Sequence, residues 1–450
     1  MIGNQCVQKY CITISNMWLY FYNMCTTNTS VVIKDLHACT SYIIHVIPVN
    51  KLSLNGTLAT IEGKTDKSIT ESPILHANKC GIYNISMTWC IKKVSNNNCT
   101  LESLIVMCNY VKINGHGYTP KSGEIKKSLN KRIILPMSEN ITVTDLSPYT
   151  TYSCQGIIVN EAGNSSLSEP VNVTTLEDIP SPPILNVENI TDTQFTFVWK
   201  NPKCLPGIVT QFEIIITWNT LFERPDWCTN DIFGNVTIRN ITNSSFKYLE
   251  GKPYTNYTAS IKARTAAGWS NDSTLITFLT LPKVPPELNE EYIKSISIDP
   301  YKARRSTTSV TILLPLFSDD NGTIKYYAIM ISRKGFNVGS KTKFKVTEQT
   351  WPNTSSWEES MNNDFSIVYQ ATGSHWSPFP NYVVNYGHIK AVKYVLGEDT
   401  ACKEISSNTD EQLYCNGPLK SDTWYDVRMR AFTSEGFRDS PVFSIKTSSY

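Results

Sequence analysis

Apolar and polar residues alternate along four stretches of the chain, and each stretch opens at a tyrosine. The four tyrosines are Tyr42, Tyr152, Tyr257 and Tyr425, and a threonine stands two residues before each of them. An alternation with a period of two is typical of a strand that buries one face. A tyrosine at the start of such a strand can bond through its hydroxyl to upstream backbone, in the corner of a β-sandwich. The pattern therefore predicts four tyrosine corners in a repeated sandwich.

Glycines and the spacing of the tyrosines extend this repeat. Three of the tyrosines are followed, eleven residues later, by Gly163, Gly268 or Gly436, where the tip of a hairpin needs a positive φ. The first three tyrosines lie 110 and 105 residues apart, which suits sandwiches of about 100 residues. The predicted fold class is all-β: tandem β-sandwiches, the last one with a long insertion.

Four modules follow from the repeat. Residues 1–64 form a partial module, because the opening strands and their buried tryptophan have no counterpart there. Residues 65–176 form a Cys-rich module, and 177–281 form a complete one that begins at a stiff Pro-rich linker. Residues 282–450 form the last module, with an aromatic-rich insert at about 335–410. Since long structureless loops are uncommon in compact domains, we expect the insert to be a subdomain.

Sequons and cysteines indicate the secretory pathway. The fifteen Asn-x-Ser/Thr sequons are about twice the number expected from the composition. The thirteen cysteines lack the paired spacing of a zinc site, which favours disulfides. The predicted glycosylation sites are Asn28, Asn55, Asn84, Asn98, Asn140, Asn164, Asn172, Asn189, Asn235, Asn240, Asn243, Asn256, Asn271, Asn321 and Asn353.

Hydropathy and charge limit the remaining possibilities. No segment approaches the ~18 apolar residues of a membrane span, and the N-terminus does not have the layout of a secretion signal. The net charge of +2 gives no argument for nucleic-acid binding. We therefore expect a fragment from the extracellular side of the plasma membrane, with its signal peptide and transmembrane segment absent.

The Pro-rich linkers, an early Trp (Trp89 or Trp199), the Leu-x-Pro-x-Thr-x-Tyr corner and the Gly tip together resemble fibronectin type III modules. The last module has narrower features in residues 317–327, in the phrase Cys-Asn-Gly-Pro-Leu-Lys at 415–420 and in residues 430–433. These resemble the membrane-proximal unit of receptor-type protein tyrosine phosphatases, above all the many-module class that includes vascular endothelial phosphatase and its insect relatives. The resemblance implies that the parent protein is a tyrosine phosphatase.

Catalytic signatures are absent from the sequence. A tyrosine phosphatase needs a His-Cys-x₅-Arg loop, in which a thiolate attacks a bound phosphate, and no His-Cys dipeptide occurs. The signatures of serine hydrolases, zinc proteases and phosphate-binding loops are also missing. We predict no catalytic residue, cofactor or metal site in this chain. A secreted glycosidase is the enzyme alternative, supported only by the inserted carboxylates Glu358, Glu359 and Asp364.

Four disulfides are predicted. Cys402 and Cys415 are the only cysteines of the last module and close a short loop, and Cys204 pairs with Cys228 in the third module by the same argument. In the second module, Cys154 shares the inward face of Tyr152 and pairs with Cys108 on a neighbouring strand. Cys90 then pairs most simply with Cys99. The cysteines without an assigned partner are Cys6, Cys11, Cys25, Cys39 and Cys80.

Because no catalytic set is present, the function is expected to lie in surfaces. Rigid modules on short linkers project binding loops, so we predict the ligand-binding or adhesion part of a cell-surface receptor, with a protein ligand on another cell or in the matrix. An adhesion, guidance or cytokine-type receptor with no associated enzyme is the alternative.

Two surfaces are candidates for contact with a partner. The last module has few sequons, so its aromatic residues Trp376, Phe379, Tyr382 and Tyr386 form the predicted ligand surface. The alternative is that these rings only pack the insert onto the sandwich. The basic clusters at 126–132 and 302–305 could contact a glycosaminoglycan, or they could be solvated loops.

Overall fold

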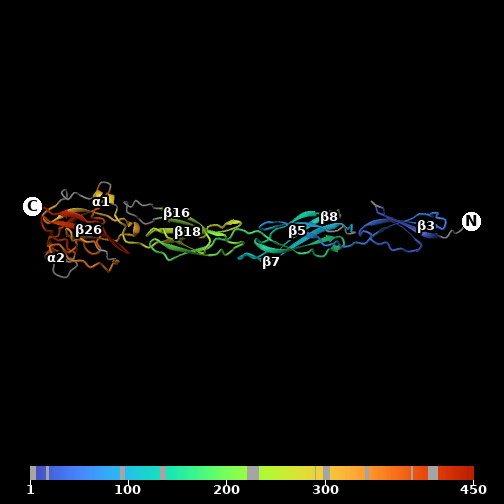
Figure 1. The fold of residues 1–450 in the computed structure, drawn as a ribbon, viewed down its shortest axis with the longest axis horizontal. Coiled ribbons are helices and arrows are strands. Elements are labelled where there is room, and N and C mark those ends of the chain that lie inside the picture. Colours follow the sequence, from blue (N-terminus) through green and yellow to red (C-terminus); the bar gives the residue numbers. More distant parts are fainter. Residues whose placement is uncertain are drawn as a thin grey trace. The chain divides into compact units, whose positions relative to one another are not determined.

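The computed structural model describes residues 7–16, 20–91, 97–131, 138–219, 233–288, 290–296, 305–339, 344–386, 389–403 and 414–450 (Figure 1). Contacts divide the chain into two compact units, and their boundary runs through the third module. The first unit holds Met1–Pro182, Pro202–Phe212 and Lys262–Asn271, and the second holds Pro183–Asn201, Glu213–Ile261 and Asp272–Tyr450. Seven β-sheets account for most of the regular structure of the described residues, which confirms the predicted all-β class.

The first module is a single sheet in the order β2-β1-β3-β4. Its strands are β1 (Val7–Ser15), β2 (Tyr20–Thr26), β3 (Ser41–Asn50) and β4 (Ala59–Lys64). Ile12, Ile14 and Tyr42 form a small core, against which loop residues such as Val31 and Ile33 pack. Strand β4 is exposed at every position. The core is therefore thin and lies on one side of one sheet.

The second module is a two-sheet sandwich. One sheet has the order β5-β6-β9, with β5 (Ile74–Cys80), β6 (Ile85–Cys90) and β9 (Ser138–Val143). The other has the order β11-β10-β7-β8, with β12 also paired to β10. Its strands are β7 (Leu101–Ile113), β8 (Gly123–Lys131), β10 (Thr150–Asn160), β11 (Gly163–Asn164) and β12 (Val171–Thr174). Trp89 and Tyr152, both fully buried, belong to the core between the sheets.

The third module has the same arrangement. Its sheets have the orders β13-β14-β17 and β16-β15-β18-β19, and β20 pairs with β18. The strands are β13 (Ile184–Glu188), β14 (Phe195–Lys200), β15 (Gln211–Asn219), β16 (Phe233–Ile241), β17 (Ser245–Tyr248), β18 (Asn256–Thr265), β19 (Gly268–Trp269) and β20 (Ile276–Leu279). Rings fill the core: Phe195 contacts Tyr248, Tyr257 and Phe278 with centroids 4.8–5.1 Å apart.

The fourth module repeats the sandwich and adds helices. Its sheets have the orders β21-β25-β24 and β23-β22-β26-β27, and β28 pairs with β26. The strands are β21 (Val310–Pro315), β22 (Tyr326–Arg333), β23 (Tyr369–Gln370), β24 (Val383–Tyr386), β25 (Ile389–Leu396), β26 (Trp424–Thr433), β27 (Gly436–Asp439) and β28 (Phe443–Lys446). The helices are α1 (Glu290–Ile296), α2 (Trp357–Asn362) and the 3₁₀ turns η1 (Asp319–Asn321) and η2 (Thr400–Lys403).

The prediction of an inserted subdomain is wrong, because the insert forms part of the sandwich itself. Strand β25 pairs with β21 along the whole length of β21, so β25 belongs to the main sheet. Trp357 on α2 and Tyr369 on β23 lie in the same core as Tyr425. The insert could not be recognised as core from its sequence position, since strand pairing between distant segments depends on the tertiary fold.

The outer faces of both sheets of the fourth module are also covered by polypeptide. Helix α1 packs Ile296 and Tyr292 against Leu313 of β21, on the face opposite to Ile312 and Leu314. On the other sheet, Phe344, Val346 and Trp351 pack with Ala328, Met330 and Phe432, which point away from the main core. In Figure 1, α1, α2 and β26 are labelled in the orange-to-red fourth module. None of the helices among the described residues has the length and apolar character to cross a bilayer.

Candidate functional site

The four repeat tyrosines build the same corner. Each side chain is buried, and each hydroxyl accepts a hydrogen bond of 2.8 Å from the backbone N–H five residues upstream. For Tyr42, Tyr152, Tyr257 and Tyr425, these donors are His37, Ser147, Lys252 and Lys420. The side chain thus satisfies a backbone donor that would otherwise be unpaired in a buried bend.

A threonine completes each corner, and the sequence reasoning missed it. Its hydroxyl donates to the carbonyl oxygen of the same upstream residue, at 2.6–2.8 Å. It also accepts from the N–H of the threonine two residues before the tyrosine, at 2.9–3.0 Å. The completing residues are Thr65, Thr175, Thr280 and Thr447, each directly after the last strand of its module. Their signal was available, since each follows its tyrosine by 22 or 23 residues.

The three linkers are held at their downstream ends in one common way. The carbonyls of Ser68, Asp178 and Lys283 accept hydrogen bonds of 2.7–2.8 Å from Asn160, Thr265 and Thr433 of the following module. Each donor lies three residues before a hairpin glycine, and each carbonyl is followed by an aliphatic residue. A Cβ built on these glycines would lie 3.1–3.7 Å from the aliphatic side chains, and all three glycines have φ between 134° and 143°. The aliphatic residues and glycines are Ile69 with Gly163, Ile179 with Gly268, and Val284 with Gly436.

Each joint between modules is consequently short. The upstream corner holds Thr65, Thr175 or Thr280, and the next module holds the carbonyl three residues later. Only two residues separate the two clamps in each linker. Two residues between fixed ends have little conformational freedom, so the backbone of each linker is closely constrained.

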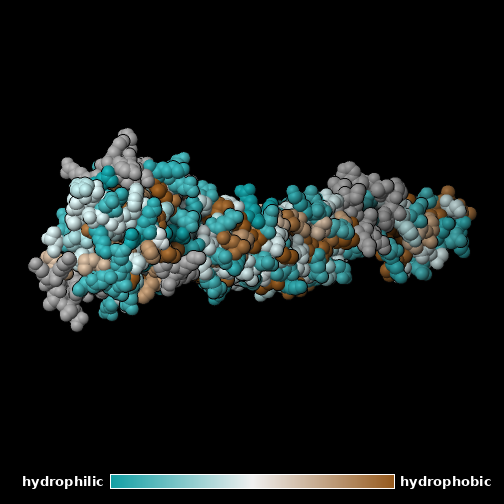
Figure 2. Space-filling view, turned by 60° about the vertical axis from the view of Figure 1, so that its left-hand side comes forward, coloured by the Kyte–Doolittle hydropathy of each residue, from teal (hydrophilic) through white to brown (hydrophobic). Residues whose placement is uncertain are grey.

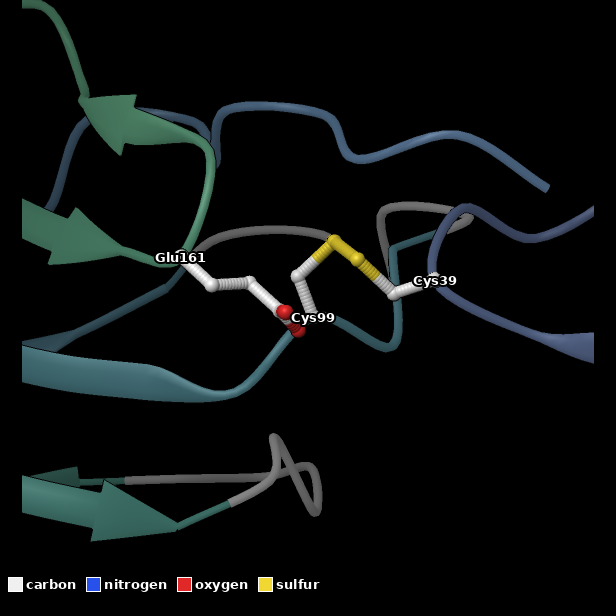
Figure 3. Close-up of side chains that lie close together, drawn as sticks. All are labelled: Cys39, Cys99 and Glu161. Atoms are coloured by element: carbon white, nitrogen blue, oxygen red, sulfur yellow. A yellow bond between two sulfur atoms is a disulfide. The ribbon is translucent and has the colours of Figure 1, made fainter. Parts of the chain in front are cut away.

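The first joint carries a disulfide that the sequence did not predict. Cys39 is bonded to Cys99 of the second module, with a Cα–Cα distance of 5.0 Å (Figure 3). The predicted pair Cys90–Cys99 is therefore wrong, and Cys90 is a free thiol. The bond joins two modules, because Cys39 lies in the corner of the module before that of Cys99, and pairing within one module cannot account for it. Beside the bond, Glu161 accepts from the N–H of Thr100, and this hydrogen bond lowers the pKa of the carboxyl.

The second joint uses backbone pairing in place of a covalent bond. His116, in the loop after β7, forms two reciprocal backbone hydrogen bonds with Leu205, of 3.1 and 2.9 Å. Gly117 has φ 82°, and a Cβ there would lie 1.9 Å from the carbonyl oxygen of Lys203. A side chain at this position would separate the two loops, so the glycine is required for the contact.

The third joint is polar. The Tyr254 hydroxyl lies 3.0 Å from the Thr323 hydroxyl, and Arg438 donates to the carbonyl of Pro285 at 2.6 Å. A cavity of about 290 Å³ opens here, with Asp192, Lys283 and Glu435 among its lining residues. Lys283 pairs with Asp192 at 3.3 Å, and Glu435 pairs with Lys345, so each charged side chain that lines the cavity has a partner of opposite charge.

Three further disulfides are present among the described residues. Cys402 is bonded to Cys415, and Cys108 to Cys154, which are the pairs proposed from the sequence. Cys11 is bonded to Cys25 on the adjacent strand. Cys228 lies outside the described residues, so the Cys204–Cys228 bond stays a prediction. Two groups of cysteine and carboxylate come together around Cys39–Cys99 and Cys402–Cys415, but a disulfide sulfur is not the thiolate that binds a metal.

Residues of the phrase at 415–420 contact several other elements of the fourth module. Asn416 accepts from the N–H of Gly397 and donates to the carbonyl of Val395, which ties it to the end of β25. Gly417 lies against the indole of Trp357, and a Cβ at this position would be 2.2 Å from the ring. The indole N–H donates to the carbonyl of Pro418 at 3.2 Å. The phrase therefore joins β25 and the helix α2 to the Tyr425 corner.

The inserted carboxylates have structural partners. Glu358 and Glu359 are exposed in the first turn of α2, where negative charge favours the helix terminus. The Ser356 hydroxyl caps this helix by accepting from the N–H of Glu359. Asp364 pairs with Lys420 at 2.5 Å and with Arg333, and the hydrogen bond from Lys420 is the main cause of its lowered pKa. This arrangement gives no support to the glycosidase alternative.

The residues of the predicted ligand surface differ in how far they are buried. Trp376 is half-buried and packs edge-on against Tyr382 and Tyr394, with centroids 5.3 and 5.6 Å apart. Phe379 and Tyr382 are 42% and 39% exposed. The side chain of Tyr386 lies outside those described. Figure 2 shows brown hydrophobic areas among teal ones on the visible face, so exposed apolar side chains also occur elsewhere.

The sequon asparagines are all accessible. Twelve of the fifteen are exposed, and the half-buried ones are Asn84, Asn256 and Asn321. The fourth module has only Asn321 and Asn353. The fold therefore leaves at least part of each sequon asparagine accessible, and most of the fourth module has no sequon.

The basic clusters are only partly described. Lys126 is exposed on β8, and Lys127 pairs with Glu139 at 2.9 Å. Residues 132 and 302–304 lie outside the described ranges. Because one of the two described lysines is already paired, no continuous cationic strip is seen in the described part of β8.

Two families match the chain. Fibronectin type III domain matches residues 180–278, and "TM proximal of protein tyrosine phosphatase, receptor type J" matches residues 312–450. The chain is a fibronectin type III array that resembles receptor-type protein tyrosine phosphatases. The second match covers the insert, the 415–420 phrase and the last corner.

Proteins similar to this array include a cell adhesion molecule and a receptor-type phosphatase. Mouse cell adhesion molecule DSCAML1 is 22% identical over 334 residues, which is 73% of this chain and 15% of that protein. Chicken receptor-type tyrosine-protein phosphatase S is 25% identical over 215 residues, which is 47% of this chain and 12% of that protein. The array thus spans a small part of the length of these relatives. A crystal structure of chicken CNTN1 FN1-FN3 domains aligns with 84% of this chain and 99% of its own, at 14% identity and a TM-score of 0.29.

Proposed function

We propose that this chain is part of the extracellular region of a receptor-type protein tyrosine phosphatase, whose catalytic domain lies outside it, and that it binds a protein ligand on another cell or in the matrix. The observation that carries the proposal is the 415–420 network of the fourth module. It lies within the region that matches the phosphatase family, and it joins the insert, the disulfide and the corner into one structure. Such a specific construction argues for more than a generic spacer module.

The distribution of sequons supports a ligand surface on the fourth module. Glycans hinder protein contacts, and thirteen of the fifteen sequons lie in the first three modules. Phe379 and Tyr382 are exposed on a module with two sequons. Aromatic side chains are enriched in binding hot spots, so this pair is the proposed point of contact.

The complete transcript tests the phosphatase part of the proposal. We expect a membrane span followed by a domain with a His-Cys-x₅-Arg loop. A complete protein with a membrane anchor and no such loop would instead favour the second candidate, an adhesion receptor without an enzyme. That candidate is supported by the similarity to the cell adhesion molecule DSCAML1 over 73% of this chain.

A binding experiment tests the ligand surface. The full chain is expressed as a secreted fusion and applied to a panel of cell types, with bound protein read by fluorescence. We expect the double variant Phe379→Ala, Tyr382→Ala to lose binding by about tenfold or more, as for a hot-spot pair. Tyr110→Ala is the matched control, since Tyr110 is 50% exposed on the second module. Equal binding by the double variant and the control would contradict the assignment.

A further inference from the structure

One sequon differs from the other fourteen. Asn98-Cys99-Thr100 has a cysteine at its middle position, and none of the others does. This cysteine is the one bonded to Cys39 across the first joint (Figure 3). Cys99 is completely buried, whereas Asn98 is exposed. A predicted glycan acceptor is therefore adjacent to a disulfide that holds two modules together.

In the joint closed by the disulfide, the amide of Asn98 that would accept a glycan is already hydrogen-bonded. The backbone N–H of Asn98 donates to the carbonyl of Ala38 at 3.2 Å. Its amide nitrogen Nδ2, the atom that would receive the sugar, donates to the Thr40 hydroxyl at 2.9 Å. On either side, Asn97 donates to the carbonyl of Ser68 and the N–H of Thr100 is held by Glu161.

The immobilised sequon is a poor substrate. Transfer of an oligosaccharide forms a bond between Nδ2 and the anomeric carbon of a lipid-linked sugar, with loss of an amide proton and departure of the lipid diphosphate. The transferase must reach Nδ2 and the threonine hydroxyl together on an accessible segment. With Cys99 bonded and buried, and with Nδ2 directed at Thr40, the segment cannot leave the joint.

We propose that Asn98 is a modification site controlled by the Cys39–Cys99 bond: it accepts an N-glycan only while Cys99 is a free thiol, and closure of the disulfide keeps it unmodified. Closure oxidises the two thiols, and a protein disulfide of the secretory pathway takes up the two electrons and two protons as it becomes a dithiol. The inference rests on the proposed function only in that the chain must enter the secretory pathway.

Site-specific mass spectrometry of the secreted full chain tests the inference. We expect low occupancy at Asn98 in the wild type and a rise of at least about twofold in Cys39→Ser, with no change at Asn172, which is exposed and distant in sequence from any free thiol. Cys11→Ser is the matched control, because it removes the other disulfide of the first module. Equal occupancy at Asn98 in the wild type and Cys39→Ser, or an equal rise in Cys11→Ser, would overturn the inference.

A second measurement covers the case in which Cys39→Ser is not secreted. Dithiothreitol added during synthesis keeps Cys99 reduced, so wild-type chains recovered from the cells should carry more glycan at Asn98. Asn189 should carry the same amount, because it is exposed in the third module, where no disulfide is seen among the described residues. No response at Asn98, with Asn189 occupied, would contradict the inference alone. Chains with no glycan at any exposed sequon would count against both this inference and the extracellular placement of the proposed function.

Discussion

The third and fourth modules share a corner and a joint but differ in what their sheets carry on the outer faces. In the third module, β16 and β18 carry the sequons Asn235, Asn240 and Asn256. In the fourth, helix α1 and the residues around Val346 cover the outer faces with polypeptide. A face covered by protein has no need of glycans to keep it from associating with other chains, and sequons are correspondingly few there.

The two modules also fill their cores from different places. The third places Trp199 on β14, an early strand, whereas β21 of the fourth has no tryptophan. Trp357 from helix α2 supplies a fully buried indole to the fourth core instead. In the fourth module an insert therefore supplies the core indole that a strand supplies in the third, so we expect the insert to contribute to the stability of this module.

The largest expected effect comes from removing that indole. Trp357→Ala should destabilise the fourth module by about 3–5 kcal/mol, through a core cavity and the lost bond to Pro418. Hydrogen exchange of the full chain should show lost protection in β26 with none lost in β18. Trp199→Ala is the matched variant and should give the reverse. Unchanged protection in β26 would mean that the insert is only an appendage.

The second expected effect is a difference between the two modules in how much stability they lose at alkaline pH. Burial raises the pKa of Tyr292 and Tyr425 to about 12, and it also raises the pKa of Tyr369 and Tyr394. In the third module, burial raises the pKa of Tyr248 and Tyr257. Since the unfolded phenol ionises near pH 10, the folded state is unaffected below about pH 10 and loses stability as the pH rises towards 12.

The fourth module has more such tyrosines, so its thermal transition should fall further. Calorimetry of the full chain at about pH 8 and about pH 11 measures this, with each transition assigned through the two tryptophan variants. Equal falls for the third and fourth modules would show that the additional buried phenols do not control alkaline stability.

The corners should behave alike in the two modules. Tyr425→Phe and Tyr257→Phe each remove the acceptor of a buried backbone N–H, on Lys420 and Lys252, and each should cost about 1–3 kcal/mol. Shifts in the same two calorimetric transitions measure both. A clearly larger loss for Tyr425→Phe would indicate that the 415–420 network depends on its corner more than the plain module does.

The smallest expected effect is at the joints. Thr433→Val and Thr265→Val each remove one hydrogen bond to a linker carbonyl, worth about 0.5–1.5 kcal/mol. Hydrogen exchange in the linkers should accelerate, around Lys283 in the first variant and around Asp178 in the second. If the linkers exchange at the wild-type rate, the aliphatic contact with the hairpin glycine is sufficient to hold the joint.

Local pattern determined the corners and the strands that follow them. Period-two alternation predicts which face of a strand is buried, and that argument paired Cys108 with Cys154, which lie directly opposite each other on β7 and β10. The threonine that completes each corner follows its tyrosine at a nearly constant spacing, which can also be read from the sequence. These features depend on backbone geometry and short separations, so a single sequence is enough to specify them.

Contacts between distant segments were decided only by the tertiary structure. The partner of Cys99 depends on how the Thr65–Ile69 linker brings one module's corner to the next module's loop, and no spacing rule contains that geometry. The place of β25 beside β21 and of Trp357 in the core depends on a long insert folding back. Nothing in the pattern of the insert distinguishes an added subdomain from missing parts of the sandwich, because both bury aromatic residues at similar intervals. Only packing against a particular neighbour separates the two.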